Sequence, residues 1–166
     1  MTASVILATE PGNRRTYPLV QPDPWRAAER EGQMPEQKTV KRAKAALRAG
    51  KSPTTAAGEF VREEIEHIRQ GKHGAKSTEQ AIAIGLSKAR RAGVPLKPPK
   101  KGQAKKRTRR SAQRDYEVGQ GKRRARKPSR KRSKASTRRL KRQPKATASR
   151  SALSRHAKRV ARRRAR

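Results

Sequence analysis

Apolar side chains recur at helical spacing in three successive segments, at residues 38–49, 53 to about 70, and 77–92. Within each segment they lie three or four positions apart, which is the period of an amphipathic helix. The residues that form the three stripes are Val40, Ala43, Leu47, Val61, Ile65, Ile68, Ile82, Leu86 and Ala89. We therefore predict three short helices, which together form a small helical domain over residues 37–95.

The ends of the predicted helices carry residues that commonly start and stop a helix. Ser52 precedes Pro53, which puts a capping hydroxyl before a proline at the first helical position. Ser77 is followed three residues later by Gln80, the spacing of a capping box in which the glutamine reaches back to the cap. Glycine ends each segment, at Gly50, Gly71 and Gly93. The boundaries are therefore predicted independently of the apolar stripes.

The segments on either side of this domain lack such periodicity. Residues 1–36 contain several prolines and are predicted to form an irregular N-terminal arm. Residues 96–146 consist largely of Lys and Arg with Gly, Ser, Pro and Gln, so we predict a disordered basic linker. Residues 147–166 are rich in Ala and Arg and are predicted to form a cationic helix that phosphate contact promotes. The predicted fold class is thus mainly α, a small helical segment followed by a long disordered basic tail with a terminal helix.

Charge is distributed unevenly along the chain. The 166 residues contain 48 Lys and Arg against 12 Asp and Glu, a formal net charge of +36. Residues 1–96 contain 17 basic and 10 acidic side chains, a net of +7, whereas residues 97–166 contain 31 basic and two acidic ones, a net of +29. Hydrophobic residues make up 30% of the chain and aromatic ones 2%, too few to bury a core along its whole length. A conventional globular enzyme of this length is therefore not expected.

The charge of the C-terminal part predicts a polyanionic partner, because a net +29 is far beyond what solubility needs. Duplex DNA carries one charge per about 1.7 Å, so this excess equals the phosphates of about 15 base pairs. One Phe, two Tyr and one Trp provide no stacking platform for unpaired bases. The sequence therefore favours the backbone of duplex DNA, with RNA as an alternative that uses the same charge.

Two groups of residues are predicted to contact nucleic acid. The first is the glycine- and lysine-rich loop at 71–78, which leads into the amides of a helix N-terminus and so suits one backbone phosphate; an ordinary capped turn explains this loop equally well. The second comprises the Lys and Arg residues of the third helix, the linker and the terminal helix, where arginine favours bidentate phosphate contacts. The predicted set is Lys72, Lys76, Ser77, Thr78, Lys88, Arg90, Arg91, Lys105, Lys106, Arg107, Arg109, Arg110, Lys122, Arg123, Arg124, Arg126, Lys127, Arg130, Lys131, Arg132, Arg138, Arg139, Arg155, Lys158, Arg159, Arg162, Arg163 and Arg164.

The sequence contains no recognisable catalytic or metal-binding motif. Cysteine is absent, which excludes disulfides, a thiol nucleophile and Cys-based metal sites. Glu64 and His67 have the i, i+3 spacing of a di-iron ligand pair, but one pair alone does not form such a site, so His67 is expected on a polar helix face. His73 and His156 are expected to be isolated, one in a loop and the other in the tail. We therefore expect no catalytic residue, no cofactor and no metal.

Residues 58–93 resemble a known group of proteins. Their second part, GKHGAKSTEQAIAIGLSKARRAG at 71–93, is similar to the motif of an uncharacterised family of small Lys/Arg-rich bacterial proteins. Residues 149–166 are similar to the C-terminal ends of those proteins. The family is loosely labelled DNA-binding or plasmid-stabilisation-like. The resemblance therefore implies a bacterial setting and a role on DNA, and it brings no catalytic residue.

These observations predict a non-enzymatic, nucleoid-associated protein of the cytoplasm that binds DNA largely independently of sequence, as a linker histone does. No stretch of the chain approaches the roughly 18 apolar residues of a membrane span, so a membrane location is not expected. Two alternatives stay open. One is an RNA- or ribosome-associated protein. The other is an adaptor whose helical domain docks a protein partner through the acids of its second helix, Glu59, Glu63, Glu64 and Glu66.

Overall fold

The structure, a computed structural model, describes residues 35–126 and 129–165. The predicted N-terminal arm therefore lies outside the described residues, except for its last two. The described part is helical and contains no strand. In chain order its elements are α2 (Gln37–Arg48), α3 (Pro53–Arg69), α4 (Thr78–Arg91), α5 (Lys106–Gly119), α6 (Arg130–Lys141), the short 3₁₀ turn η2 (Ala146–Ala148) and α7 (Arg150–Arg164).

The three helices predicted between residues 37 and 95 are confirmed, and so are their caps. Ser52 Oγ accepts a hydrogen bond from the amide of Thr55 at 3.3 Å, directly before the proline that begins α3. Ser77 Oγ accepts one from the amide of Gln80, also at 3.3 Å. The reciprocal bond of the capping box differs from the prediction, because Gln80 Oε1 accepts from the amide of Lys76 rather than from Ser77.

The main core lies where α3 packs between α2 and α4. Phe60 on α3 is its largest side chain and is fully buried. The other buried members are small and come from all three helices and from the segment after α4, namely Ala43, Ala56, Ala57, Ala89, Ala92 and Val94. Because most of these are alanines, the three helices come close together around a single aromatic ring.

Gly85 marks the closest approach of α3 and α4. A methyl group added there would lie 2.7 Å from the Cα atom of Val61 and 3.0 Å from the carbonyl oxygen of Phe60. Both are backbone atoms, so they have little freedom to move away. Glycine costs helix propensity at this position, and the tight contact between the two helices explains why it is placed there.

A second, smaller apolar cluster connects the C-terminal part of the chain to the helical domain. Ala148 from η2 is fully buried against Ile68 at the end of α3, Ala75 in the following loop and Ala81 on α4. Arg69 Nε donates a 2.9 Å hydrogen bond to the carbonyl oxygen of Ala148. The C-terminal segment is therefore attached to the domain by an apolar contact and a hydrogen bond.

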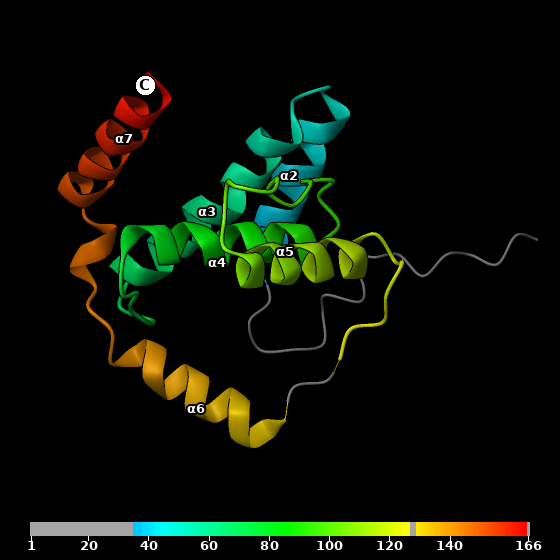
Figure 1. The fold of residues 1–166 in the computed structure, drawn as a ribbon. Helices are drawn as coiled ribbons and strands as arrows, with labels where there is room; N and C mark the ends of the chain where they lie inside the picture. Colours follow the sequence, from blue (N-terminus) through cyan, green and yellow to red (C-terminus); the bar gives the residue numbers. More distant parts are fainter. Residues whose placement is uncertain (1–34, 127–128, 166) are drawn as a thin grey trace, which may run out of the picture.

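The predicted disordered linker over residues 96–146 is wrong, because it contains α5 and α6, and helices extend from Gln37 to Arg164 across both described ranges. The predicted terminal helix is present as α7. Figure 1 shows α5 lying beside α4, with α6 and α7 following it around the body. The prediction assumed that a segment without an apolar stripe stays unfolded. Lys, Arg and Ala are, however, good helix formers, and single small residues suffice to attach these helices. The attachment points of α5 are Ala112 and Gly119, both buried.

Candidate nucleic-acid interface

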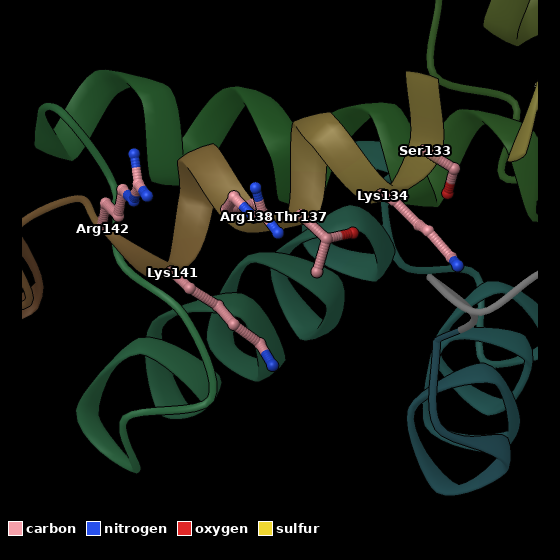
Figure 2. Close-up of a pocket in the computed structure, with 6 residues that line it drawn as sticks. All are labelled: Ser133, Lys134, Thr137, Arg138, Lys141 and Arg142. Atoms are coloured by element: carbon pink, nitrogen blue, oxygen red, sulfur yellow. The ribbon is translucent and has the colours of Figure 1, made fainter. Parts of the chain in front are cut away.

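The helix α6 is the most polar of the basic elements, and none of its residues is buried. Three of its turns present polar or basic side chains in adjacent pairs, spaced four residues apart. Figure 2 shows these six side chains, which line a hollow of 540 Å³: Ser133, Lys134, Thr137, Arg138, Lys141 and Arg142. Because 3.6 residues make one turn, this spacing keeps the pairs on one face of the helix. The result is a row of cations and hydroxyls along its length.

A similar row lies on α7, which begins at the N-cap Ser149. Five exposed cations line a second hollow of 430 Å³: Arg155, Lys158, Arg159, Arg162 and Arg163. Arg159 also pairs with the carboxylate of Glu79 at the start of α4, as does His156, whose Nδ1 lies 3.2 Å from the same oxygen. His156 is therefore not isolated as predicted, and the pair of contacts holds α7 against α4.

Most cations of the C-terminal part have no carboxylate nearby. Among the Lys and Arg side chains described in residues 97–126 and 129–165, only Arg123 and Arg159 form an ion pair within 4.0 Å, with Glu117 and Glu79 respectively. The positive charge is thus not compensated within the described part of the molecule. Such a surface attracts a polyanion over long range and exchanges its counterions on binding.

The predicted phosphate site at the loop 71–78 is in contact with the C-terminal segment of the same chain. The amide of Gly74 donates to the carbonyl oxygen of Leu140 at 3.0 Å, and the amide of Ala75 donates to that of Pro144 at 3.1 Å. The hydroxyl of Thr78 donates to the carbonyl oxygen of Thr147 at 2.8 Å. The predicted hydroxyl of Thr78 is therefore already bonded within the protein, as are the amides of Gly74 and Ala75 in the loop before it.

The other three residues predicted in this loop, Lys72, Lys76 and Ser77, differ in exposure and in their contacts. Lys72 is exposed and lies 3.6 Å from a carboxylate oxygen of Glu36. Lys76 is exposed, whereas Ser77 is half-buried and caps α4. A role of this loop in phosphate binding stays a prediction that would require the C-terminal segment to move.

Two predicted contacts on α4 have partners inside the protein. Lys88 is buried and lies 2.7 Å from Glu64 and 3.7 Å from Glu63. Arg90 is also buried, and its Nε donates to the carbonyl oxygen of Leu96 at 3.2 Å. Burial lowers the pKa of the Arg90 guanidinium from its ordinary value, against the opposing effect of the Asp115 charge. These two cations are therefore not part of the exposed basic surface.

The other predicted residues lie mostly on the surface. Arg91 is exposed and 3.9 Å from Asp115 on α5. Arg109 is half-buried, Lys127 lies outside the described residues, and the side chain of Arg164 is not described. The exposed members are Lys105, Lys106, Arg107, Arg110, Lys122, Arg123, Arg124, Arg126, Arg130, Lys131, Arg132, Arg138, Arg139, Arg155, Lys158, Arg159, Arg162 and Arg163.

The sequence-based set missed three residues of the α6 row, Lys134, Lys141 and Arg142. The sequence does contain a pattern that indicates these residues: Lys134 and Lys141 are seven residues apart and lie four and three positions from Arg138, which is the spacing of one helix face. That signal is informative only once the segment is known to be helical. Because this segment was predicted to be a disordered linker, the helical spacing was not used to choose site residues.

The acidic face expected on the second helix is also different in the structure. Glu63 and Glu64 on α3 are buried, not exposed. His67 is half-buried and lies beside His73, with ring centroids 6.3 Å apart. His73 Nε2 lies 3.2 Å from Glu64 Oε1. An adaptor surface built on these acids would therefore keep only the outer pair, Glu59 and Glu66.

The chain has no match among protein-family models, curated proteins or solved structures. The resemblance of residues 58–93 to a family of basic bacterial proteins accordingly stays a prediction. Among the described residues, no helix is both long enough and apolar enough to cross a lipid bilayer.

Proposed function

We propose that this protein is a non-enzymatic, largely sequence-independent DNA-binding protein that associates with the nucleoid and acts by neutralising phosphates. The observation that carries this proposal is the uncompensated charge of residues 97–126 and 129–165, where Arg123 and Arg159 are the only described Lys or Arg side chains with a carboxylate within 4.0 Å. Neutralisation of phosphates by Lys and Arg releases counterions, which drives binding without reading base sequence.

The dimensions of α6 and α7 suit a duplex backbone. At 1.5 Å per residue, the 12 residues of α6 span about 18 Å and the 15 residues of α7 about 22 Å. Duplex DNA presents one phosphate charge per about 1.7 Å, so α6 is as long as about 11 charges and α7 as long as about 13. Arginine predominates in α7, and its planar guanidinium can contact two phosphate oxygens at once.

The aromatic residues favour a duplex over an unpaired strand. Binding of single strands generally relies on exposed aromatic rings on which bases stack. Of the two aromatic residues in the described ranges, Phe60 is fully buried in the core and Tyr116 is half-buried on α5. The described surface therefore offers cations rather than a stacking platform.

A salt titration with a random-sequence duplex tests the proposal. Three exposed lysines of α6 are replaced together, in the variant K131Q/K134Q/K141Q. The matched control removes the same charge from α2, in the variant K38Q/K41Q/R48Q, whose residues are exposed as well. Because each lost phosphate contact changes the slope of log K against log salt by about 0.9, the α6 variant should lose up to about three units of slope. The α2 variant should lose much less.

Equal losses in the two variants would show that total charge, and not the helical C-terminal surface, determines binding. Weak binding of the wild type at low salt, with no steep salt dependence, would overturn the proposal altogether. A competition experiment between the duplex and a structured RNA of equal length then compares the affinity of the protein for DNA with its affinity for RNA. A clear preference for RNA would replace DNA as the partner and leave the phosphate-binding surface in place.

A further inference from the structure

Three side chains that can bind a metal ion meet next to the end of α3. Glu64 and His67 lie one turn apart on the helix, and His73 comes from the loop that follows. One ligand atom from each lies within 4.8 Å of the other two. The side chains are 1%, 13% and 18% exposed for Glu64, His67 and His73 respectively. The cluster is therefore largely shielded from water and is separate from the basic surface of α6 and α7.

The contact between His73 and Glu64 requires a proton or a metal ion between the two side chains. His73 Nδ1 lies 3.2 Å from the carbonyl oxygen of Gly74, and because a carbonyl can only accept, this nitrogen carries the hydrogen. In the neutral ring, Nε2 then presents a lone pair. It lies 3.2 Å from Glu64 Oε1, which is another acceptor. Two lone pairs at this distance repel each other unless a proton or a metal ion lies between them.

The charges around Glu64 also leave room for a cation. The Lys88 ammonium lies 2.7 Å from Oε2 of Glu64 and 3.7 Å from Oε1 of Glu63, so one buried cation faces two buried carboxylates. Neither oxygen of Glu64 accepts a hydrogen bond of good geometry, and the same is true of Glu63 Oε1. The Lys88 ammonium compensates Oε2 of Glu64, whereas Oε1 has no donor. A buried carboxylate oxygen without a donor is costly, and a bound cation removes that cost.

The surroundings of the two histidines match those of metal ligands. A ligating imidazole normally donates its other ring N–H to a carbonyl or carboxylate, which fixes the orientation of the ring. Gly74 supplies such a carbonyl to His73. Glu36 places a carboxylate oxygen 3.1 Å from Nε2 of His67. Lys88 plays a related part for Glu64, since it holds one carboxylate oxygen while the other faces the cluster.

We propose that Glu64, His67 and His73 bind a divalent transition-metal ion of the zinc class. Two imidazoles and one carboxylate suit zinc and its neighbours, whereas magnesium and calcium prefer oxygen ligands. Ligand bonds of about 2.0–2.1 Å in a tetrahedral site set the ligand atoms about 3.3 Å apart. Nε2 of His73 and Oε1 of Glu64, 3.2 Å apart, already have this spacing, and the other separations in the cluster, which are within 4.8 Å, would shorten to it.

The position of the site gives the ion a structural role. It would join the loop at 71–76 to α3, and this loop binds the C-terminal segment through the amides of Gly74 and Ala75. A metal ion would thus strengthen the surface on which the segment between α6 and η2 docks. This role does not depend on nucleic-acid binding.

Calorimetric titration of the full-length, untagged chain with Zn²⁺ tests the proposal, after removal of nucleic acid and of metals with a chelator. The wild type should bind one equivalent with a defined affinity. His73→Gln and His67→Gln should each weaken that affinity at least tenfold. The matched control, His156→Gln, removes a histidine on α7 outside the cluster and should bind as the wild type does. Mg²⁺ should not bind at the site.

Ring ¹⁵N spectra of the wild type provide a second measurement, which remains valid even if a histidine variant fails to fold. On addition of Zn²⁺, the ring nitrogens of His67 and His73 should shift together and those of His156 should not. Absence of saturable binding would mean that a proton occupies the gap beside His73, and would overturn the proposal. Wild-type affinity in His73→Gln, or a shift confined to His156, would overturn it as well.

Discussion

The ammonium of Lys88 on α4 lies 2.7 Å from Oε2 of Glu64 on α3, and both side chains are buried, 7% and 1% exposed. The pair joins the two helices that share the largest interface of the fold. Removal of one member of a buried ion pair leaves an uncompensated charge and typically costs about 3–5 kcal/mol. Lys88→Met should therefore strongly lower the free energy of unfolding, measured by urea denaturation followed by circular dichroism.

Two further variants separate charge from packing at this position. Lys97→Met changes an exposed lysine beyond α4 and should alter stability by less than about 0.5 kcal/mol. The double variant Lys88→Met/Glu64→Gln removes both charges and should recover part of the loss. A double variant less stable than Lys88→Met would contradict the ion-pair explanation.

The close approach of α3 and α4 at Gly85 predicts opposite effects of the same substitution at two glycines. Gly85→Ala places a methyl group 2.7 Å from the Cα atom of Val61, and overpacking of this kind costs about 1–3 kcal/mol, more than the roughly 1 kcal/mol gained in helix propensity. Gly58→Ala, on the exposed side of α3, meets nothing within 4 Å. It should stabilise by about 0.5–1 kcal/mol. Thermal unfolding of both variants checks the signs, and a stabilised Gly85→Ala would contradict the tight contact.

The docking of the C-terminal segment depends on Ala148, which is fully buried, whereas its neighbour Ala146 is exposed. Ala148→Glu would bury a carboxylate among Ile68, Ala75 and Ala81, so the segment should detach instead. The amides of Gly74 and Ala75, which donate to this segment, should then exchange their hydrogens at least tenfold faster. Ala146→Glu should leave their exchange unchanged. Equal exchange rates in the two variants would show that Ala148 does not anchor the segment.

A carboxyl group on α5 reports whether this basic segment is helical. Gln113 and Glu117 lie one turn apart, and Gln113 Nε2 donates to Glu117 Oε1 at 2.8 Å. This hydrogen bond, with those of Arg123, holds the pKa of Glu117 below its ordinary value of 4.5. The stabilisation is present above that ordinary value and is lost as the pH falls through the lowered pKa. Carbon-detected NMR should find the midpoint below 4.5, and Gln113→Ala should raise it. An unshifted wild-type midpoint would mean that the helical contact is absent.

The three helices between residues 37 and 91 could be predicted because their signals are local. An apolar stripe, a serine cap and a terminal glycine occur together in each of α3 and α4. The helices α5 and α6 lack these signals, whereas the terminal helix predicted over residues 147–166 is present as α7, with Ser149 as its N-cap. The small residues Ala112 and Gly119 attach α5, and Ala148 attaches η2, and an isolated small residue does not indicate in a sequence whether it is buried.

In the candidate sites too, features that depend on one segment could be predicted, whereas features that depend on contacts between distant segments could not. The cations of α6 and α7 could be predicted as a charged surface from their number alone. The burial of Glu63 and Glu64 could not, because their partner Lys88 comes from the next helix. The meeting of His73 with Glu64 depends on how the loop at 71–76 turns back along α3. Contacts between elements decide these positions, and one sequence does not record them.

The alanine-rich interior has a thermodynamic consequence for the whole protein. Within residues 35–126 and 129–165, the buried apolar side chains other than Phe60, Ile68 and Val94 are alanines, which expose little hydrocarbon when the chain unfolds. The heat capacity of unfolding scales with exposed apolar area and is about 12–15 cal/mol/K per residue in ordinary domains. It should be lower here, so the curve of stability against temperature should be broad and shallow. Cold should then destabilise this protein less than it destabilises one with a core of large aliphatic side chains.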